Sequence, residues 1–237
     1  MVNASRNVTA PKRATPTAPG WPEMLAGGAA YGLMILLVVW LLPGVTDPAV
    51  AGVVGLLASG VMGLVALVVA VLIRIRGLAA FGFRRAEPRH LVIGAVLGVA
   101  AYVLGVLVAV IYTAVTADAE NVQASYQAAA SGGWLSLVLG LVAGAILTPV
   151  GEESFFRGVV ANALLARYGA WVGIIGSAAV FAIAHGINPV LPVAFVVGVL
   201  TALLYRASGS IWPGVILHGT NNAIAFVLPV IVGLVTS

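Results

Sequence analysis

Repeated apolar runs constrain the fold of this chain more than any other feature. A helix needs about 20 mainly apolar residues to cross the hydrocarbon core of a bilayer. Hydrophobic residues make up 62% of the sequence, too many for the polar surface of a soluble domain. The apolar runs lie at about residues 26–42, 49–73, 91–115, 134 onward, 171–185, 190–205 and 211–235.

These runs predict an all-α, polytopic transmembrane helical bundle. Seven spans are expected, or eight if Pro229 or the Glu-Glu segment at 152–153 divides a helix. Residues 1–22 are rich in Pro, Ala, Thr and Asn and are predicted to form a disordered cytoplasmic tail. Residues 23–237 are predicted to form a single transmembrane domain, with a catalytic core at about 134–225.

The distribution of charge predicts the orientation of the bundle. Five arginines lie between the second and third runs, at 74–89, whereas the loop at 116–133 has acidic residues and no Lys or Arg. Because cytoplasmic loops carry an excess of Lys and Arg, we expect the N-terminus in the cytoplasm and a multi-pass protein of the cell membrane. The net charge of +4 thus reports topology, and we expect the lipid bilayer as a partner and no nucleic acid.

The segment Gly151–Gly158 places Glu152, Glu153 and Arg157 within an apolar chain. A charged side chain at membrane depth costs about 2.5–3.5 kcal/mol on insertion scales, so such groups mark functional sites. On a helix, Glu153 and Arg157 are i,i+4 neighbours and can pair. Glu152 points about 100° away and is left available as a general base. The alternative is a buried Glu-Arg pair that joins helices, with Glu152 lining a wet crevice.

Two histidines lie in later apolar runs, away from other ionisable groups. Phe181 and His185 share one run, and His218 and Asn222 are i,i+4 neighbours on another. In one chemistry, Glu152 and the two histidines bind a divalent ion such as zinc, which activates a water. In the other, Glu152 and His185 activate water without a metal, and His218 with Asn222 stabilises the oxyanion. The sequence leaves both open.

Cysteine usage and small-residue spacing supply two further predictions. The chain has no cysteine, which excludes disulfides, thiolate metal sites and a cysteine nucleophile.

Gly55, Ser59 and Gly63 recur four residues apart, as do Gly140 and Gly144. Small residues at this spacing let helices approach closely in lipid, so both sets are predicted to be packing faces.

The order of these motifs resembles the CPBP family of intramembrane proteases, the CAAX protease and bacteriocin-processing group also called Abi. That family is marked by E-E-x-x-x-R, F-x-x-x-H and H-x-x-x-N/D on successive membrane helices. In this chain the motifs read Glu152-Glu153-x-x-x-Arg157, Phe181-x-x-x-His185 and His218-x-x-x-Asn222. The resemblance covers about residues 145–225, and the basic stretch at 81–85 is similar to the loop that precedes the family's core.

The resemblance implies a CAAX-protease-like bundle with a membrane-embedded active site. Its reacting groups would be Glu152, His185, His218 and Asn222, with Glu153 and Arg157 as support and Phe181 shaping the pocket. Eukaryotic relatives remove the C-terminal tripeptide from prenylated CAAX proteins, and prokaryotic ones are linked to peptide maturation or bacteriocin self-immunity. The family has been labelled metalloprotease, although a metal-free glutamate mechanism fits its best-described members.

The resulting expectation is an intramembrane endopeptidase whose catalytic cavity opens toward the cytoplasmic half. Its substrate would be a peptide, or a membrane-associated or C-terminally prenylated protein. The non-enzymatic alternative is a bacteriocin-immunity or membrane scaffold protein that binds a peptide in the same cavity. A transporter is disfavoured because the sequence has no convincing inverted repeat.

Overall fold

The computed structural model describes residues 18–236, which form helices and no strand. The predicted all-α bundle is therefore confirmed. The predicted tail, residues 1–22, lies outside the described residues except for 18–22, and the first helix begins at Trp21. The α-helices are α1 (Trp21–Leu41), α2 (Pro48–Ile73), α3 (Pro88–Thr116), α4 (Ala124–Ser131), α5 (Trp134–Leu141), α6 (Thr148–Phe155), α7 (Asn162–Trp171), α8 (Ser177–Ile183), α9 (Val190–Ser208) and α10 (Trp212–Thr236).

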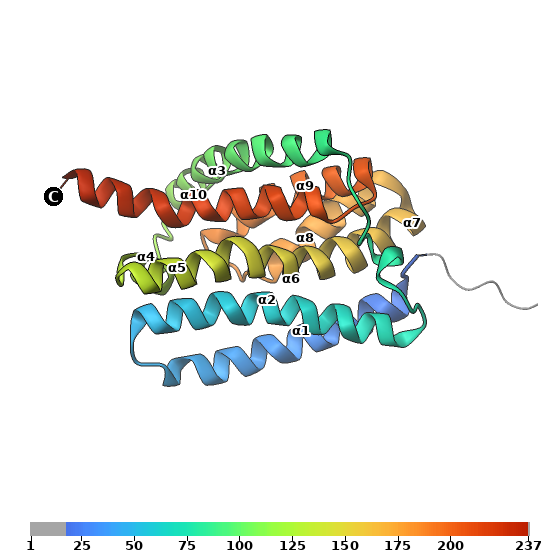
Figure 1. Ribbon diagram of the computed structural model, residues 1–237, viewed down its shortest axis with the longest axis horizontal. Helices are drawn as coiled ribbons and strands as arrows, with labels where there is room; N and C mark the ends of the chain where they lie inside the picture. The colour runs from blue at the N-terminus through green and yellow to red at the C-terminus, as the bar shows by residue number, and fades with distance from the viewer. Residues whose placement is uncertain (1–17, 237) are drawn as a thin grey trace, which may run out of the picture.

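Within residues 18–236, six helical segments are long and apolar enough to cross a membrane. The fourth, Trp134–Ile183, has 50 residues, and its backbone leaves the helical conformation at Gly169 (φ 79°, ψ −172°). At this point the chain reverses, and α8 runs back packed against α9 (Figure 1). Because this segment has two arms, the six candidate spans comprise seven helices, which is close to the seven spans predicted. Helix α10 runs continuously through Pro229, which excludes the eighth span expected there.

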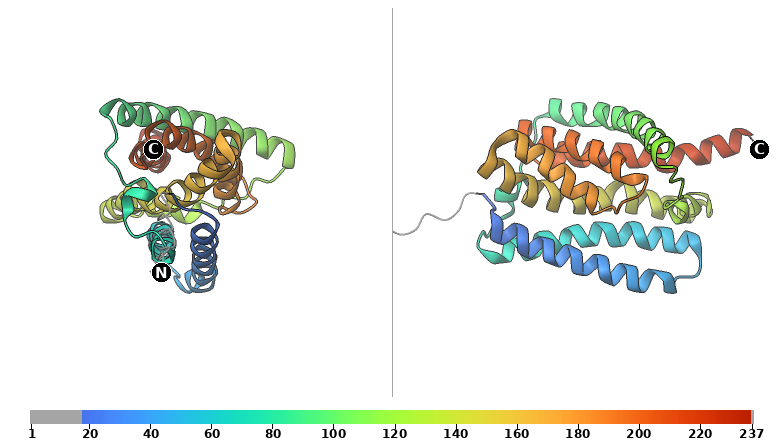
Figure 2. Two further views of the ribbon diagram at one scale, coloured as in Figure 1. Left: turned by 90° about the vertical axis from the view of Figure 1, so that its right-hand side faces the viewer. Right: turned by 180° about the vertical axis from the view of Figure 1, so that it is seen from behind.

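Helix α6 lies at the centre of the arrangement that forms the site. It packs against α2 on one side and α10 on the other, while α1 covers the outer side of α2 (Figure 1). Helices α3, α8 and α9 complete the other side of the bundle, with α9 in contact with α3, α8 and α10 (Figure 2). The short helix α4 contacts α2, α5 and α10. Residues of both halves of the chain therefore approach α6.

Charge is distributed unequally between the two ends of the bundle. The arginine-rich α2–α3 connection, helix α7 with Arg167 and the last turn of α9 with Arg206 lie at one end, and the acidic α3–α4 connection lies at the other (Figure 1). Large apolar side chains remain exposed along the helices between the ends; Trp40 and Val115 are 76% and 80% exposed. Such exposed apolar surface suits a lipid environment. The structure thus agrees with a multi-pass membrane protein.

Three π-helical turns interrupt the segment that carries the Glu-Glu motif and the following helix. They span Val142–Leu147, Phe156–Ala161 and Val172–Gly176. The first leads directly into α6, where Thr148 and Pro149 are the first two residues. A π turn changes the direction in which the following side chains point from the helix, and such turns are frequent at functional sites. The helix therefore changes type just before the Glu-Glu segment and is not divided there.

Glycines allow α2 and α6 to touch backbone to backbone. A Cβ atom on Gly63 would lie 2.1 Å from the carbonyl oxygen of Gly151, and one on Gly151 would lie 1.9 Å from that of Gly60. Neither distance is sterically possible, so only glycine fits. The predicted packing face at 55–63 is confirmed, and it fixes the position of the next residue in α6, Glu152.

Replacing Gly63 by alanine is expected to destabilise the protein. The new methyl group must push α6 away from α2, and overpacking of this kind costs about 1–3 kcal/mol. The measurement is the thermal midpoint of detergent-solubilised protein, with Gly32→Ala in α1 as control, since no atom lies within 4 Å of a Cβ placed there. Equal midpoints for the two variants would contradict the close contact.

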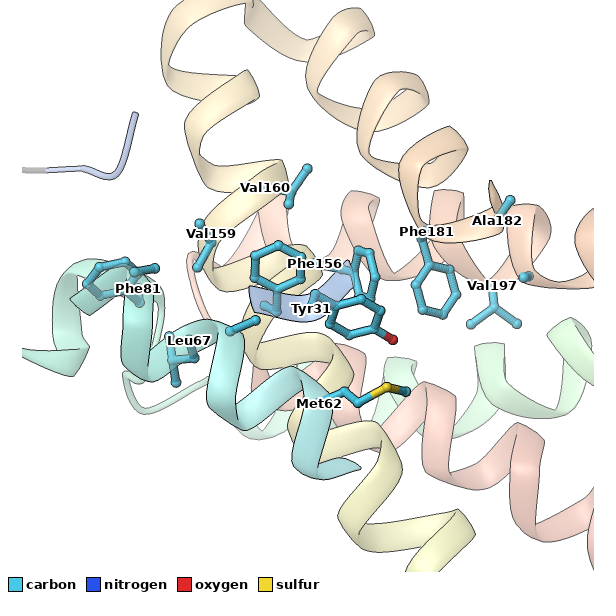
Figure 3. Close-up of a cluster of buried hydrophobic side chains, with 14 of the residues drawn as sticks. Tyr31, Met62, Leu67, Phe81, Phe156, Val159, Val160, Phe181, Ala182 and Val197 are labelled. Carbon is cyan, nitrogen blue, oxygen red and sulfur yellow. The ribbon is translucent and has the colours of Figure 1, made fainter. Parts of the chain in front are cut away.

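An aromatic cluster joins α1 to the end of α6 and to α8. The Tyr31 ring stacks on Phe155 with centroids 5.5 Å apart and meets the edge of Phe156 at 5.1 Å. Phe156 in turn meets Phe181 of α8 at 4.9 Å. Figure 3 shows Tyr31, Phe156 and Phe181 in line, with the tyrosine hydroxyl at the edge of the cluster beside Met62. This cluster is the apolar wall of the site.

Candidate active site

Glu153 and Arg157 form a fully buried ion pair along one face of the α6 segment. Their side chains are 0% exposed, and Nε of Arg157 lies 3.1 Å from Oε2 of Glu153. Arg157 also donates from Nη2 to the Gly198 carbonyl at 3.2 Å and to the hydroxyl of Thr201. Its guanidinium lies 4.5 Å from the centre of the Phe181 ring. The predicted i,i+4 pair is present, and Arg157 links it to α9 and α8.

His218 of α10 connects the two carboxylates. Its Nδ1 lies 3.1 Å from Oε1 of Glu153, and its Nε2 lies 3.8 Å from Oε2 of Glu152. Since a carboxylate can only accept, Nδ1 is the donor to Glu153 and Nε2 faces Glu152. Glu153 therefore does more than pair with Arg157: it orients the imidazole of His218. This second role was not predicted from the sequence.

Glu152 is buried, with 2% of its surface exposed, and its two oxygens differ. Oε1 accepts a hydrogen bond of 2.5 Å from the hydroxyl of Ser59 in α2. Oε2 is buried and has no hydrogen-bond partner among the residues that the structure describes. A buried carboxylate oxygen without a donor is a costly arrangement. It is also the arrangement that suits an acceptor for a proton from a bound water.

His185 follows α8, and its ring packs against Phe181. The ring centroids are 4.7 Å apart, and Nδ1 lies 2.8 Å from the Phe181 carbonyl. Because a carbonyl can only accept, Nδ1 carries the proton, and the lone pair of a neutral imidazole is then on Nε2. The Phe181 ring also meets His218 at 5.8 Å. Phe181 thus separates and orients the two histidines, in keeping with a role in shaping the site.

Asn222 is fixed by two hydrogen bonds, one turn beyond His218 on α10. Its Nδ2 donates to the Gly144 carbonyl at 2.9 Å, and its Oδ1 accepts from Nδ2 of Asn221 at 3.0 Å. Gly144 belongs to the π turn before α6. These bonds set the amide orientation and leave one N–H of Nδ2 for another acceptor.

The structure brings the predicted residues together unequally. Glu152, Glu153, Arg157 and His218 form one connected network. For His185, the hydrogen bonds and ring contact within residues 18–236 are with Phe181, Ala182 and Asn188, and none joins it to Glu152. Two cavities within the described residues, of about 440 and 590 Å³, are both lined in part by Arg206 at the arginine-rich end. None of the predicted site residues lines either cavity. The cavity expected at the site stays a prediction.

The proposed zinc ligands Glu152, His185 and His218 do not form a metal centre in this arrangement. Across residues 18–236, no three His, Cys, Asp or Glu side chains are grouped so that they could hold an ion. The donor set therefore does not fit a three-ligand site of the kind that catalytic zinc requires.

Several residues near the site were missed or assigned differently from sequence. Ser59 was predicted only as part of a packing face, although it also binds Glu152. The hydroxyls of Tyr31 and Tyr126 interact electrostatically with the Glu152 carboxylate, and Asn221 orients Asn222. The tyrosines carry no motif signal, because they lie on α1 and α4, far from the motif in sequence. Asn221, by contrast, is adjacent to a predicted site residue.

Comparison with known families supports the interpretation of this geometry. Residues 134–224 match the family model described as type II CAAX prenyl endopeptidase Rce1-like. These residues form an Rce1-like CAAX protease domain. The match begins at α5, ends within α10, and agrees with the resemblance to the CPBP/CAAX proteases. No curated protein and no solved structure matches the chain.

The matched segment, residues 134–224, is similar to a peptidase family. It contains Glu152, Glu153, Arg157, Phe181, His185, His218 and Asn222. Helices α1 to α4, including Ser59, lie before it. The match is to a peptidase family and gives no support to the alternative of a non-catalytic immunity or scaffold protein.

Proposed function

We propose that this chain is a glutamate-type intramembrane endopeptidase that hydrolyses a peptide bond in a membrane-associated or C-terminally prenylated substrate. The observation that carries the proposal is the free Oε2 of buried Glu152, 3.8 Å from Nε2 of His218. A carboxylate held by one oxygen and open at the other is suited to general base catalysis. The family match supplies the substrate class as an expectation.

Hydrolysis would begin with a water bound at Oε2 of Glu152. Glu152 takes one proton as the water oxygen attacks the scissile carbonyl carbon, and Nε2 of His185 accepts a hydrogen bond from the same water. The free N–H of Asn222 and a protonated Nε2 of His218 donate to the oxyanion. The proton on Glu152 then passes to the amide nitrogen as the C–N bond breaks. This returns a carboxylate and gives two peptide products.

The zinc-dependent alternative makes a different prediction about metal removal. Under the proposed mechanism, a farnesylated peptide ending in a CAAX sequence is cleaved at the same rate before and after chelation with 1,10-phenanthroline. Metal analysis of the purified protein accompanies the assay. Stoichiometric zinc, lost together with activity, would contradict the metal-free mechanism. An unprenylated peptide of the same sequence is the control for the substrate class, and we expect it to be cleaved more slowly.

A further inference from the structure

Ser59 is the one residue of the described chain whose side chain donates a hydrogen bond to Glu152. The bond runs from Oγ to Oε1 at 2.5 Å, across 93 positions of sequence. Ser59 lies on α2, before the CAAX protease domain at 134–224. A contact between these two parts of the chain therefore determines which carboxylate oxygen remains free.

The position of Ser59 is fixed by its surroundings. On the same helix, Gly60 and Gly63 follow it and come close to backbone atoms of the α6 segment. These backbone contacts prevent α2 and α6 from sliding past each other, so the Ser59 hydroxyl is held at hydrogen-bond distance from Glu152. One turn earlier, the Leu56 carbonyl accepts a separate buried hydrogen bond of 2.7 Å from the Thr148 hydroxyl.

Two tyrosines, from α1 and α4, are influenced by the charge of Glu152. The Tyr31 ring is stacked on Phe155, and the Glu152 carboxylate acts electrostatically on its hydroxyl. The same carboxylate acts on Tyr126 of α4. Burial, with a smaller contribution from the Glu152 charge, raises the pKa of Tyr126, so this hydroxyl stays neutral. Both residues come from helices that precede the protease domain.

We propose that Ser59 is a positioning residue for the catalytic base, so that α2 completes an active site that the protease domain alone does not contain. The inference rests on the proposed function. By binding Oε1, Ser59 fixes the carboxylate plane of Glu152 and directs Oε2 toward Nε2 of His218 and the attacking water. Without that bond, the carboxylate can rotate and spends less time in the productive orientation.

If Ser59 only holds helices together, its replacement should change stability and not catalysis. Thr148 provides a matched control for this possibility. Ser59 and Thr148 each donate one side-chain hydrogen bond between α2 and α6, but only the Ser59 bond ends on Glu152. If both bonds only join helices, Ser59→Ala and Thr148→Val will lower the thermal midpoint and leave kcat unchanged. If Ser59 positions the base, Ser59→Ala alone will lower kcat.

The test measures kcat and KM for a farnesylated CAAX peptide, with the thermal midpoint of each variant. We expect Ser59→Ala to lower kcat by about 10- to 100-fold with little change in KM, because a hydrogen bond to a charged group is lost. Ser59→Thr keeps the hydroxyl and should restore most of the activity. Thr148→Val should retain wild-type kcat.

The outcomes separate this inference from the proposed function. Wild-type kcat in Ser59→Ala overturns the positioning role, as do equal losses of kcat in Ser59→Ala and Ser59→Thr. Equal losses in Ser59→Ala and Thr148→Val also overturn it, because helix docking then explains both. A wild-type protein that cleaves no peptide, or a fully active Glu152→Gln variant, overturns the proposed function itself.

Discussion

Glu152→Gln is expected to lower kcat by about 10²- to 10⁴-fold, the usual contribution of a general base. The amide has the same shape as the carboxylate, and its oxygen can still accept the 2.5 Å hydrogen bond from Ser59. The group beside His218 can no longer take a proton from water. The loss should therefore appear in kcat, with KM and the thermal midpoint close to the wild-type values.

Glu120→Gln is the matched control for this substitution. Glu120 is exposed in the connection before α4, and the hydrogen bond recorded for it uses its backbone N–H, so the change should leave cleavage unaltered. His185→Ala complements the test, because His185 is proposed to bind the same water. If Glu152→Gln hydrolyses the farnesylated peptide at the wild-type rate, Glu152 is not the base.

Replacing Arg157 by methionine should have the largest effect on stability. The guanidinium is 0% exposed, pairs with Glu153 and bonds to α9. Its removal leaves the Glu153 carboxylate buried without its cation. Breaking one side of a buried pair costs about 3–5 kcal/mol. The measurement is the unfolding free energy in detergent titrated with sodium dodecyl sulfate.

Two comparisons make the Arg157 prediction specific. Arg89→Met removes a pair with Glu87 whose side chains are 69% and 62% exposed, and exposed pairs contribute about 0–1 kcal/mol. Adding Glu153→Gln to Arg157→Met should recover part of the loss, because the unpaired charge is then gone. An Arg157→Met protein as stable as Arg89→Met would show that the buried pair does not support the fold.

The spans were predictable because each depends on local composition. Apolar runs near 20 residues must form helices in lipid, where every backbone polar group needs an internal partner. The different surroundings of Glu152 and Glu153 also follow from helical geometry, since consecutive side chains diverge by about 100°. For the same reason, the Glu153–Arg157 pair was expected from its i,i+4 spacing.

Contacts between helices could not be predicted from local spacing. The bond from Glu153 to His218 spans 65 positions, and the bond from Ser59 to Glu152 spans 93. Small residues four apart indicate a packing face but do not identify the helix that packs there. The same limit applies to the zinc alternative, because grouping Glu152 with two histidines requires the positions of three separate helices.

Hydropathy and helical period act over a few turns, so the amino-acid sequence is enough to specify a bundle of membrane helices that carries a Glu-Glu-Arg cluster and two histidine motifs. How the cluster is used depends on contacts between helices. Backbone contact at Gly63 and Gly151 brings Ser59 to one oxygen of Glu152, and α10 brings His218 between the carboxylates. These positions depend on side-chain packing between distant helices, which no local pattern encodes.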